Sequence, residues 1–339
     1  MIKRIISSLT VLVACAAPLF GDSQAEKLLK KSDSWFSSDA GRTALSNILS
    51  WQSDYGDWPK NTDTTKDKYR ADRAKLKGSF DNGATLGELR LLARAFHFTG
   101  DKSYQKAVLL GFDHILKAQY PNGGWPQYYP LSSSYHRRIT FNDNTMVRIL
   151  EFLRDTTTSE DFDFLGDDRR AAAAKAFEQG VDCILKCQVI VDGQLTVWCA
   201  QHDEVTLAPA KARTYELVSL SGAESAGILK FLMSLKSPSP EVIQAVNSGM
   251  AWFDSVKIVG FRYTGSSTQP SLVADPSARL LWARFYEIGT NRPMFCDRDG
   301  IVKYDIQEIG SERRGGYTWY GNWGESLANT YAKWPHRKP

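Results

Sequence analysis

Apolar residues recur at helical spacing through most of the chain. Between residues 84 and 98 one apolar stripe is formed by Leu86, Leu89, Leu92, Ala93 and Phe96. Residues 103–119 carry a second stripe, and Thr99-Gly100-Asp101 between them is typical of a helix stop followed by a new cap. The pattern predicts an α-hairpin there. It also predicts helices at 45–51, 144–155, 168–187, 222–235, 240–256 and 277–288.

The predicted helices form pairs that recur at roughly 60 to 75 residues. Two connections are alike, Gly56-Asp57-Trp58-Pro59-Lys60 and Gly123-Gly124-Trp125-Pro126-Gln127, and we expect each to place an indole at a rim. Stacked helix pairs bury their apolar faces against one another. We therefore expect a mainly α fold, an α/α toroid of inner and outer helices with short β-strands near 188–198 and 257–263. An open α-solenoid is the alternative.

Composition is that of a globular protein, with 339 residues, 42% hydrophobic and 24% charged. The net charge of +4 comes without a Lys/Arg stripe, which argues against a nucleic-acid partner. Residues 1–21 have a basic start and a short apolar run, so we read them as an export signal rather than a membrane span. A lipoprotein signal that would lipidate Cys15 competes with simple secretion. Residues 22–339 are expected to form one domain, acting as a monomer.

Four cysteines remain in the mature chain, Cys183, Cys187, Cys199 and Cys296. Disulfides between Cys199 and Cys296 or between Cys187 and Cys199 are compatible with export, and free buried thiols are equally compatible. No histidine lies at zinc-ligand spacing from these cysteines, which argues against a zinc site.

A short phrase occurs twice ahead of a predicted inner helix, as Phe80-Asp81-Asn82 and as Phe141-Asn142-Asp143. The simplest interpretation is N-capping, because Asp and Asn oxygens accept from free backbone N–H groups. If the two helices run side by side, however, the same oxygens would converge on one cleft. Carboxylate and carboxamide oxygens are ligands that Ca²⁺ prefers. Two carboxylates alone predict weak binding that an anionic ligand would complete.

Cationic residues are candidates for the other side of that cleft. Lys211 and Arg213 precede the predicted helix at 222–235, and Arg284 and Arg298 follow later. Guanidinium groups bind carboxylates through paired hydrogen bonds, although pairing with acidic neighbours within the protein is the alternative. The ten tryptophans suggest either sugar-binding platforms or core packing.

The chain resembles the pectate lyases of polysaccharide lyase family 10 over nearly the whole mature sequence. The resemblance rests on an ordered set of motifs: Gly123-Gly124-Trp125-Pro126-Gln127, Ile139-Thr140-Phe141-Asn142-Asp143, Trp198-Cys199-Ala200-Gln201-His202-Asp203, Arg213-Thr214-Tyr215-Glu216, Ser221-Gly222-Ala223-Glu224-Ser225, Trp282-Ala283-Arg284-Phe285-Tyr286-Glu287 and Asn291-Arg292-Pro293. One departure is Asp57, which stands where a glycine is expected.

The resemblance implies an α/α toroid that cleaves polygalacturonate by β-elimination with Ca²⁺, giving unsaturated oligogalacturonides. It implies that Asp81 and Asp143 meet the metal and that Arg213 is the base. It also implies that substrate is bound by Lys211, Arg284, Arg298, Asn82 and Tyr215. An arginine base is unusual because guanidinium normally stays protonated. We expect Lys211 and the metal to disfavour the charged form.

Two other functions are compatible with these residues. An α/α-toroid glycoside hydrolase could use Asp81 and Asp143 as an acid/base pair. A non-catalytic polyuronate-binding protein would bind substrate without turnover. An unsaturated, ultraviolet-absorbing product distinguishes the lyase from both.

Overall fold

The computed structural model describes residues 23–265 and 270–338. The expected signal at 1–21, with Cys15, lies outside the described residues. The helices are α1 (Gln24–Leu28), α2 (Asp39–Ser50), α3 (Leu86–Thr99), α4 (Lys102–Ala118), α5 (Thr145–Thr158), α6 (Gly166–Cys187), α7 (Gly222–Met233), α8 (Pro240–Ser255), α9 (Ser311–Gly315) and α10 (Trp323–Ala332). The mainly α prediction is confirmed. In the part of the chain described, no helix has the length and apolarity needed to cross a membrane.

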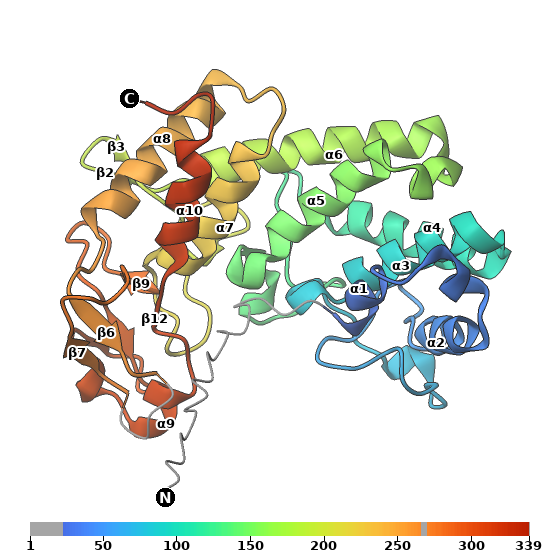
Figure 1. Cartoon of the computed structure of the whole chain (residues 1–339), viewed down its shortest axis with the longest axis horizontal. Helices are drawn as coiled ribbons and strands as arrows, with labels where there is room; N and C mark the ends of the chain where they lie inside the picture. The colour runs from blue at the N-terminus through green and yellow to red at the C-terminus, as the bar shows by residue number, and fades with distance from the viewer. Residues whose placement is uncertain (1–22, 266–269, 339) are drawn as a thin grey trace, which may run out of the picture.

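The long helices form an inner and an outer row. Inner helices α3, α5, α7 and α10 contact one another in succession, and outer helices α4, α6 and α8 do the same. Each pair packs tightly, α3 with α4, α5 with α6, and α7 with α8. Figure 1 shows α2, α3 and α4 at one end of this arc and α7, α8 and α10 at the other. The expected rows of inner and outer helices are therefore present.

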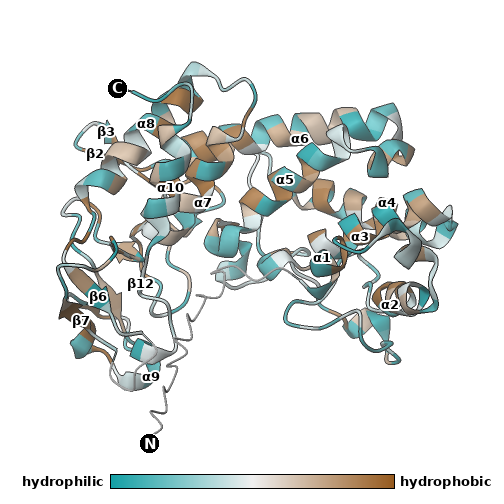
Figure 2. Cartoon of the chain, viewed as in Figure 1, coloured by the Kyte–Doolittle hydropathy of each residue, from teal (hydrophilic) through white to brown (hydrophobic). Residues whose placement is uncertain are grey.

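Helix burial follows the row in which a helix lies. In α7 ten of the twelve residues are buried, and Figure 2 shows this inner helix as largely hydrophobic. The outer helix α6 buries six of its 22 residues and alternates in colour along its length. An inner helix is covered on several sides by its neighbours, so it needs apolar residues around most of its circumference.

The expected helix at 277–288 is wrong. The segment instead forms β8 (Trp282–Ala283) and β9 (Phe285–Tyr286). Antiparallel pairing joins β8 to β12 (Tyr320–Gly321) and β9 to β5 (Leu220–Ser221). Its aromatic residues favour extended backbone, and pairing with distant strands outweighs a weak helical period. The fourth inner helix is α10, which was not predicted from the sequence.

The remaining strands are also short and antiparallel. Four pairs are formed by β1 (Ile139–Thr140) with β4 (Gln201–His202), β2 (Ile190–Val191) with β3 (Gln194–Leu195), β6 (Phe261–Tyr263) with β7 (Leu272–Ala274), and β10 (Phe295–Cys296) with β11 (Val302–Lys303). The strands expected near 188–198 and 257–263 are confirmed in β2, β3 and β6.

One tryptophan in each repeat ties the chain to the preceding outer helix. The indole N–H of Trp58 donates to Ile48 O of α2 at 2.8 Å, and that of Trp125 donates to Ile115 O of α4 at 2.9 Å. Trp198 bonds α6 in the same way and Trp282 bonds α8. The side chains of Trp58, Trp125 and Trp198 are fully buried. The expectation that these turns place indoles at a rim is wrong, because their N–H groups satisfy carbonyls inside the core.

A glutamine after each of α2, α4 and α6 makes a second repeated link. Gln188 Nε2 donates to Thr196 O at 2.9 Å and to Ala245 O of α8 at 3.0 Å. Gln52 and Gln119 make the corresponding pairs of bonds in their own repeats. Each amide thus holds its own turn and the next outer helix together.

Replacing Gln188 with leucine should remove the side-chain amide donor from two buried carbonyls. We expect Gln188→Leu to lower the free energy of unfolding by about 2–4 kcal/mol in urea denaturation. Gln179, exposed on α6, provides the matched control, and Gln179→Leu should change stability by less than about 0.5 kcal/mol. Equal effects of the two substitutions would contradict a structural role for the repeated glutamine.

Candidate active site

The repeated tryptophans also position side chains at a common centre. The residue two places after each tryptophan is Lys60, Gln127, Ala200 or Arg284. Backbone bonds anchor these positions to the start of a neighbouring inner helix: Phe80 N donates to Gln127 O at 3.1 Å and Gly222 N donates to Arg284 O at 2.8 Å. Three of the four positions carry a polar side chain that reaches the paired phrases around Asp81 and Asp143.

The two phrases have the same backbone shape. Phe80 and Phe141 are buried, and the third residue of each phrase, Asn82 or Asp143, has a positive φ of 54° or 52°. Asn and Asp tolerate this left-handed conformation better than most residues. Asp81 therefore corresponds in space to Asn142, and Asn82 corresponds to Asp143, so carboxylate and amide exchange places between the repeats.

Asp81 is a buried acceptor and does not cap its helix. Its side chain is 1% exposed, and Oδ2 accepts from Lys60 Nζ and Gln127 Nε2, each at 2.5 Å. Among the described residues, Oδ1 has no hydrogen-bond partner. No side-chain cap bond precedes α3 or α5. The capping interpretation of the phrase is thus wrong at both occurrences.

Asp143 lies beside Asp81 in a mostly buried position. Its Oδ2 accepts from Asn142 Nδ2 at 2.7 Å, and its Oδ1 is 3.9 Å from the guanidinium of Arg284. Burial, followed by the negative charge of Asp81, raises the pKa of Asp143 to about 7, although Arg284 opposes the shift. The structure thus confirms that the two repeats bring their carboxylates together.

Arg284 is the buried cation of this centre. Its guanidinium forms an ion pair with Glu224, donates to Asn142 Oδ1 at 3.3 Å and lies 4.7 Å from the ring centroid of Tyr317. Burial by itself lowers the pKa of Arg284, but Glu224, Tyr317 and Asp143 together raise it more, so the net shift is upward. Arg284 therefore stays charged next to Asp143.

Arg213 comes from the loop before α7 and is about one-third exposed. Its guanidinium pairs with Glu216 Oε1 at 3.0 Å, and Tyr317 donates its hydroxyl to the same oxygen at 2.9 Å. Burial alone would lower the pKa of Arg213. The charges of Glu216 and Tyr135 act in the opposite direction, and the net shift of the pKa is upward. Lys211 is not among the main charges that act on Arg213, so the expectation that it disfavours the cation is not supported.

In the described part of the chain, no hydrogen bond or ion pair joins the other predicted substrate-binding side chains to Asp81 or Asp143. Lys211 is exposed next to Gly300, and Arg298 pairs with Glu312 at 3.2 Å with both side chains about two-thirds exposed. The ring of Tyr215 packs under Arg313 at 4.3 Å. Asn82 donates to Asn61 Oδ1 at 3.2 Å. Of the predicted cations, Arg284 contacts the carboxylate pair directly.

Lys60, Gln127 and His136 are members of this site that sequence reasoning missed. The signal was present for the first two, because both end the Trp-Pro turn that was recognised as a repeat. His136 follows Tyr135, the residue that faces Arg213. Burial, followed by the positive charges of Lys60 and Arg213, lowers the pKa of His136. Its imidazole is therefore neutral near neutral pH.

The carboxylate pair suits a cation only with help from other ligands. Within residues 23–265 and 270–338, no three His, Cys, Asp or Glu side chains group as a metal site. The free Oδ1 of Asp81 and the raised pKa of Asp143 are what a bound divalent cation would relieve.

The four cysteines, in contrast, are free and buried. Neither disulfide considered from the sequence is present.

The known proteins that this chain is similar to are polysaccharide lyases. The family model of pectic acid lyase matches residues 52–328. The chain is similar to a family 10 polysaccharide lyase from Cellvibrio cellulosa, with 37% identity, 93% of this chain and 97% of that chain covered, and a TM-score of 0.80. An aspartate-to-alanine variant of such a lyase from the same organism, in complex with trigalacturonic acid, is 38% identical over 89% of this chain and 96% of that chain, with a TM-score of 0.81. No curated protein matches.

The raised pKa of Asp143 has a consequence for stability. A carboxyl whose pKa is higher in the folded than in the unfolded protein costs folding free energy once it ionises. This cost is absent below about pH 4 and complete above about pH 7. Asp143→Asn should therefore raise the melting temperature at about pH 8 by about 2–5 °C, and by less at about pH 5.

An exposed aspartate without a resolved side-chain partner supplies the control for this measurement. Asp67→Asn should change the melting temperature by less than about 2 °C at both pH values, because the residue is exposed. If Asp143→Asn were less stable than the parent at about pH 8, the two carboxylates could not be repelling each other in the free protein.

Proposed function

The chain belongs to the pectic acid lyase family, and from this premise we propose that it is a calcium-dependent pectate lyase cleaving polygalacturonate by β-elimination. The observation that carries the proposal is the convergence of two carboxylates, one with a free buried oxygen, with Arg284, to which Glu216 and Tyr317 connect Arg213. Such a centre offers sites for a cation and for the carboxylates of a uronate chain. The signal-like residues 1–21 support export.

The reaction removes the C5 proton, which is α to the uronate carboxylate. The electron pair of that C–H bond becomes the C4–C5 double bond while the bond from C4 to the glycosidic oxygen breaks, and the departing oxygen takes a proton from solvent. Bound Ca²⁺ would act as a Lewis acid on the uronate carboxylate and stabilise the negative charge that develops next to C5. Asp81 and Asp143 would hold that ion.

Arg213 is the proposed base. Glu216 and Tyr135 hold its guanidinium in a defined position, whereas one terminal nitrogen of Arg284 already contacts both Glu224 and Asn142. Removing a proton from carbon requires the neutral guanidine, and Glu216 makes that form scarce. Activity should therefore rise toward alkaline pH.

The family assignment favours a lyase over the glycoside hydrolase considered from the sequence. A non-catalytic polyuronate-binding protein stays as the alternative outcome of the test. It predicts binding of oligogalacturonate without any gain in ultraviolet absorbance.

The first experiment follows the ultraviolet absorbance of the unsaturated product on polygalacturonate. We expect turnover that a chelator abolishes and added Ca²⁺ restores. Arg213→Ala should lower kcat by about 10²–10⁴-fold while oligogalacturonate binding persists. Arg279, paired with Glu325 and three-quarters exposed, offers a matched control, and Arg279→Ala should keep activity within about twofold. Near-normal turnover of Arg213→Ala would exclude it as the base.

The second experiment tests how Glu216 acts on Arg213. Glu216→Gln removes the charge that raises the pKa of Arg213, so the rising limb of the pH–rate profile should move to lower pH. The isosteric amide keeps an oxygen for Tyr317. A uniform loss of rate with an unchanged profile would mean that Glu216 serves only to position the loop.

A further inference from the structure

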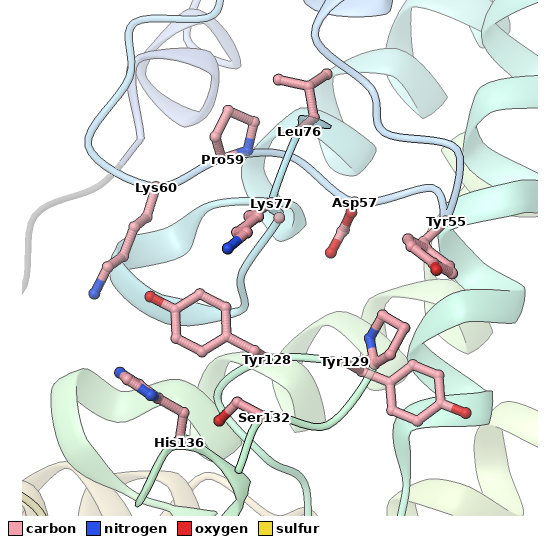
Figure 3. Close-up of a pocket in the computed structure, with 12 residues that line it drawn as sticks. Tyr55, Asp57, Pro59, Lys60, Leu76, Lys77, Tyr128, Tyr129, Ser132 and His136 are labelled. Carbon is pink, nitrogen blue, oxygen red and sulfur yellow. The ribbon is translucent and has the colours of Figure 1, made fainter. Parts of the chain in front are cut away.

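A cavity of about 500 Å³ adjoins the carboxylate centre. Its walls come from the loop after α2, the segment before α3, and the loop between α4 and α5, and Figure 3 shows residues of all three segments around a common space. Lys60 lines the cavity and also donates to Asp81, so cavity and centre share a side chain. A polymer chain crossing the centre could therefore continue into this space.

Charge in the cavity suits an anion. Lys60 and Lys77 both line it, and Lys77 makes no ion pair with any residue in the described part of the chain. Asp57 is the one acidic residue in the lining. Its carboxylate accepts from Ser53 and lies 3.4 Å from His114 Nε2, deep in the protein at 2% exposure. Asp57 is thus engaged by its own neighbours, which leaves Lys77 as a free cation.

Aromatic rings give the same cavity its apolar surface. Tyr55, Tyr128 and Tyr129 all line it, and Tyr55 is 55% exposed. Figure 3 shows Tyr55 and Tyr129 near one end of the space, with Lys60 and His136 at the other. Flat rings pack against the C–H faces of sugars, and such rings beside a free ammonium group match a sugar that carries a carboxylate.

We propose that this cavity is a subsite for a uronate unit of the polymer beyond the units at the cleavage centre. In it Lys77 pairs with the carboxylate and Tyr55 packs against the sugar ring. The inference rests on the proposed lyase function. It adds that affinity grows with chain length, because only a longer oligomer fills both the centre and this subsite.

The test compares Lys77→Ala with Lys75→Ala on trigalacturonate and on a hexamer. Lys75 is exposed two residues away and does not line the cavity, so it controls for net charge. Lys77→Ala should raise KM for the hexamer about three- to fivefold, with kcat within twofold and little change for the trimer. Lys75→Ala should resemble the parent on both. Equal effects of Lys77→Ala on trimer and hexamer, or none on either, would overturn the subsite.

Two further variants test the ring. Tyr55→Ala should raise KM for the hexamer while Tyr55→Phe keeps it, because the packing surface rather than the hydroxyl is used. An unchanged KM in Tyr55→Ala would contradict the proposed packing.

Calorimetry of hexamer binding in a chelator separates this inference from the proposed function. A parent protein that binds no hexamer in the calorimeter, and that also fails to cleave it when Ca²⁺ is present, would refute both. A parent that cleaves it while Lys77→Ala and Lys75→Ala bind equally well would refute the subsite alone.

Discussion

The hydrogen bond from a buried indole to the preceding outer helix is the interaction on which the rest of the structure depends. Trp58, Trp125, Trp198 and Trp282 each use their N–H in this way, at 2.7–2.9 Å. Each bond sets where the chain leaves the outer helix, and so where the residue two places later lies. Because the same bond recurs, side chains far apart in sequence reach one centre. These four tryptophans affect function by positioning other side chains and not by offering a surface to sugar.

The centre is built at some cost to the folded state. Two neighbouring carboxylates are partly withdrawn from water, and a buried arginine is held between Glu224 and Asn142. Like charges at close range destabilise a fold unless another ion is present. A second cost is the buried Oδ1 of Asp81, which accepts no hydrogen bond from the described residues. A fold that tolerates these features retains a site that a cation and an anionic polymer can complete. In our proposal, the adjoining cavity lined by Lys77 binds a further unit of the same polymer.

Much of the helical framework could be predicted because apolar residues recur at regular spacing. The expected helices correspond to α2 through α8, with ends that shift by a few residues, and the turn at Thr99-Gly100-Asp101 is confirmed by the cap that Asp101 makes with Ser103 N at 2.8 Å. The prediction failed at 277–288, where strand pairing with residues near 221 and 320 decides the conformation. Periodicity within a segment contains no information about a partner that is distant in sequence.

The sequence by itself determined the family, the repeat of helix pairs and the presence of two acidic phrases ahead of inner helices. These are properties of local pattern and residue order. Only the tertiary structure decided that Asp81 and Asp143 share a centre and that Lys60 and Gln127 donate to Asp81. It also decided that Glu216, rather than Lys211, is the main charge that shifts the pKa of Arg213. It likewise decided that Lys211 lies next to Gly300 and that Arg298 pairs with Glu312 rather than with either carboxylate. Burial and the distances between charges arise when the repeats pack together, so they cannot be computed from residue spacing along one chain.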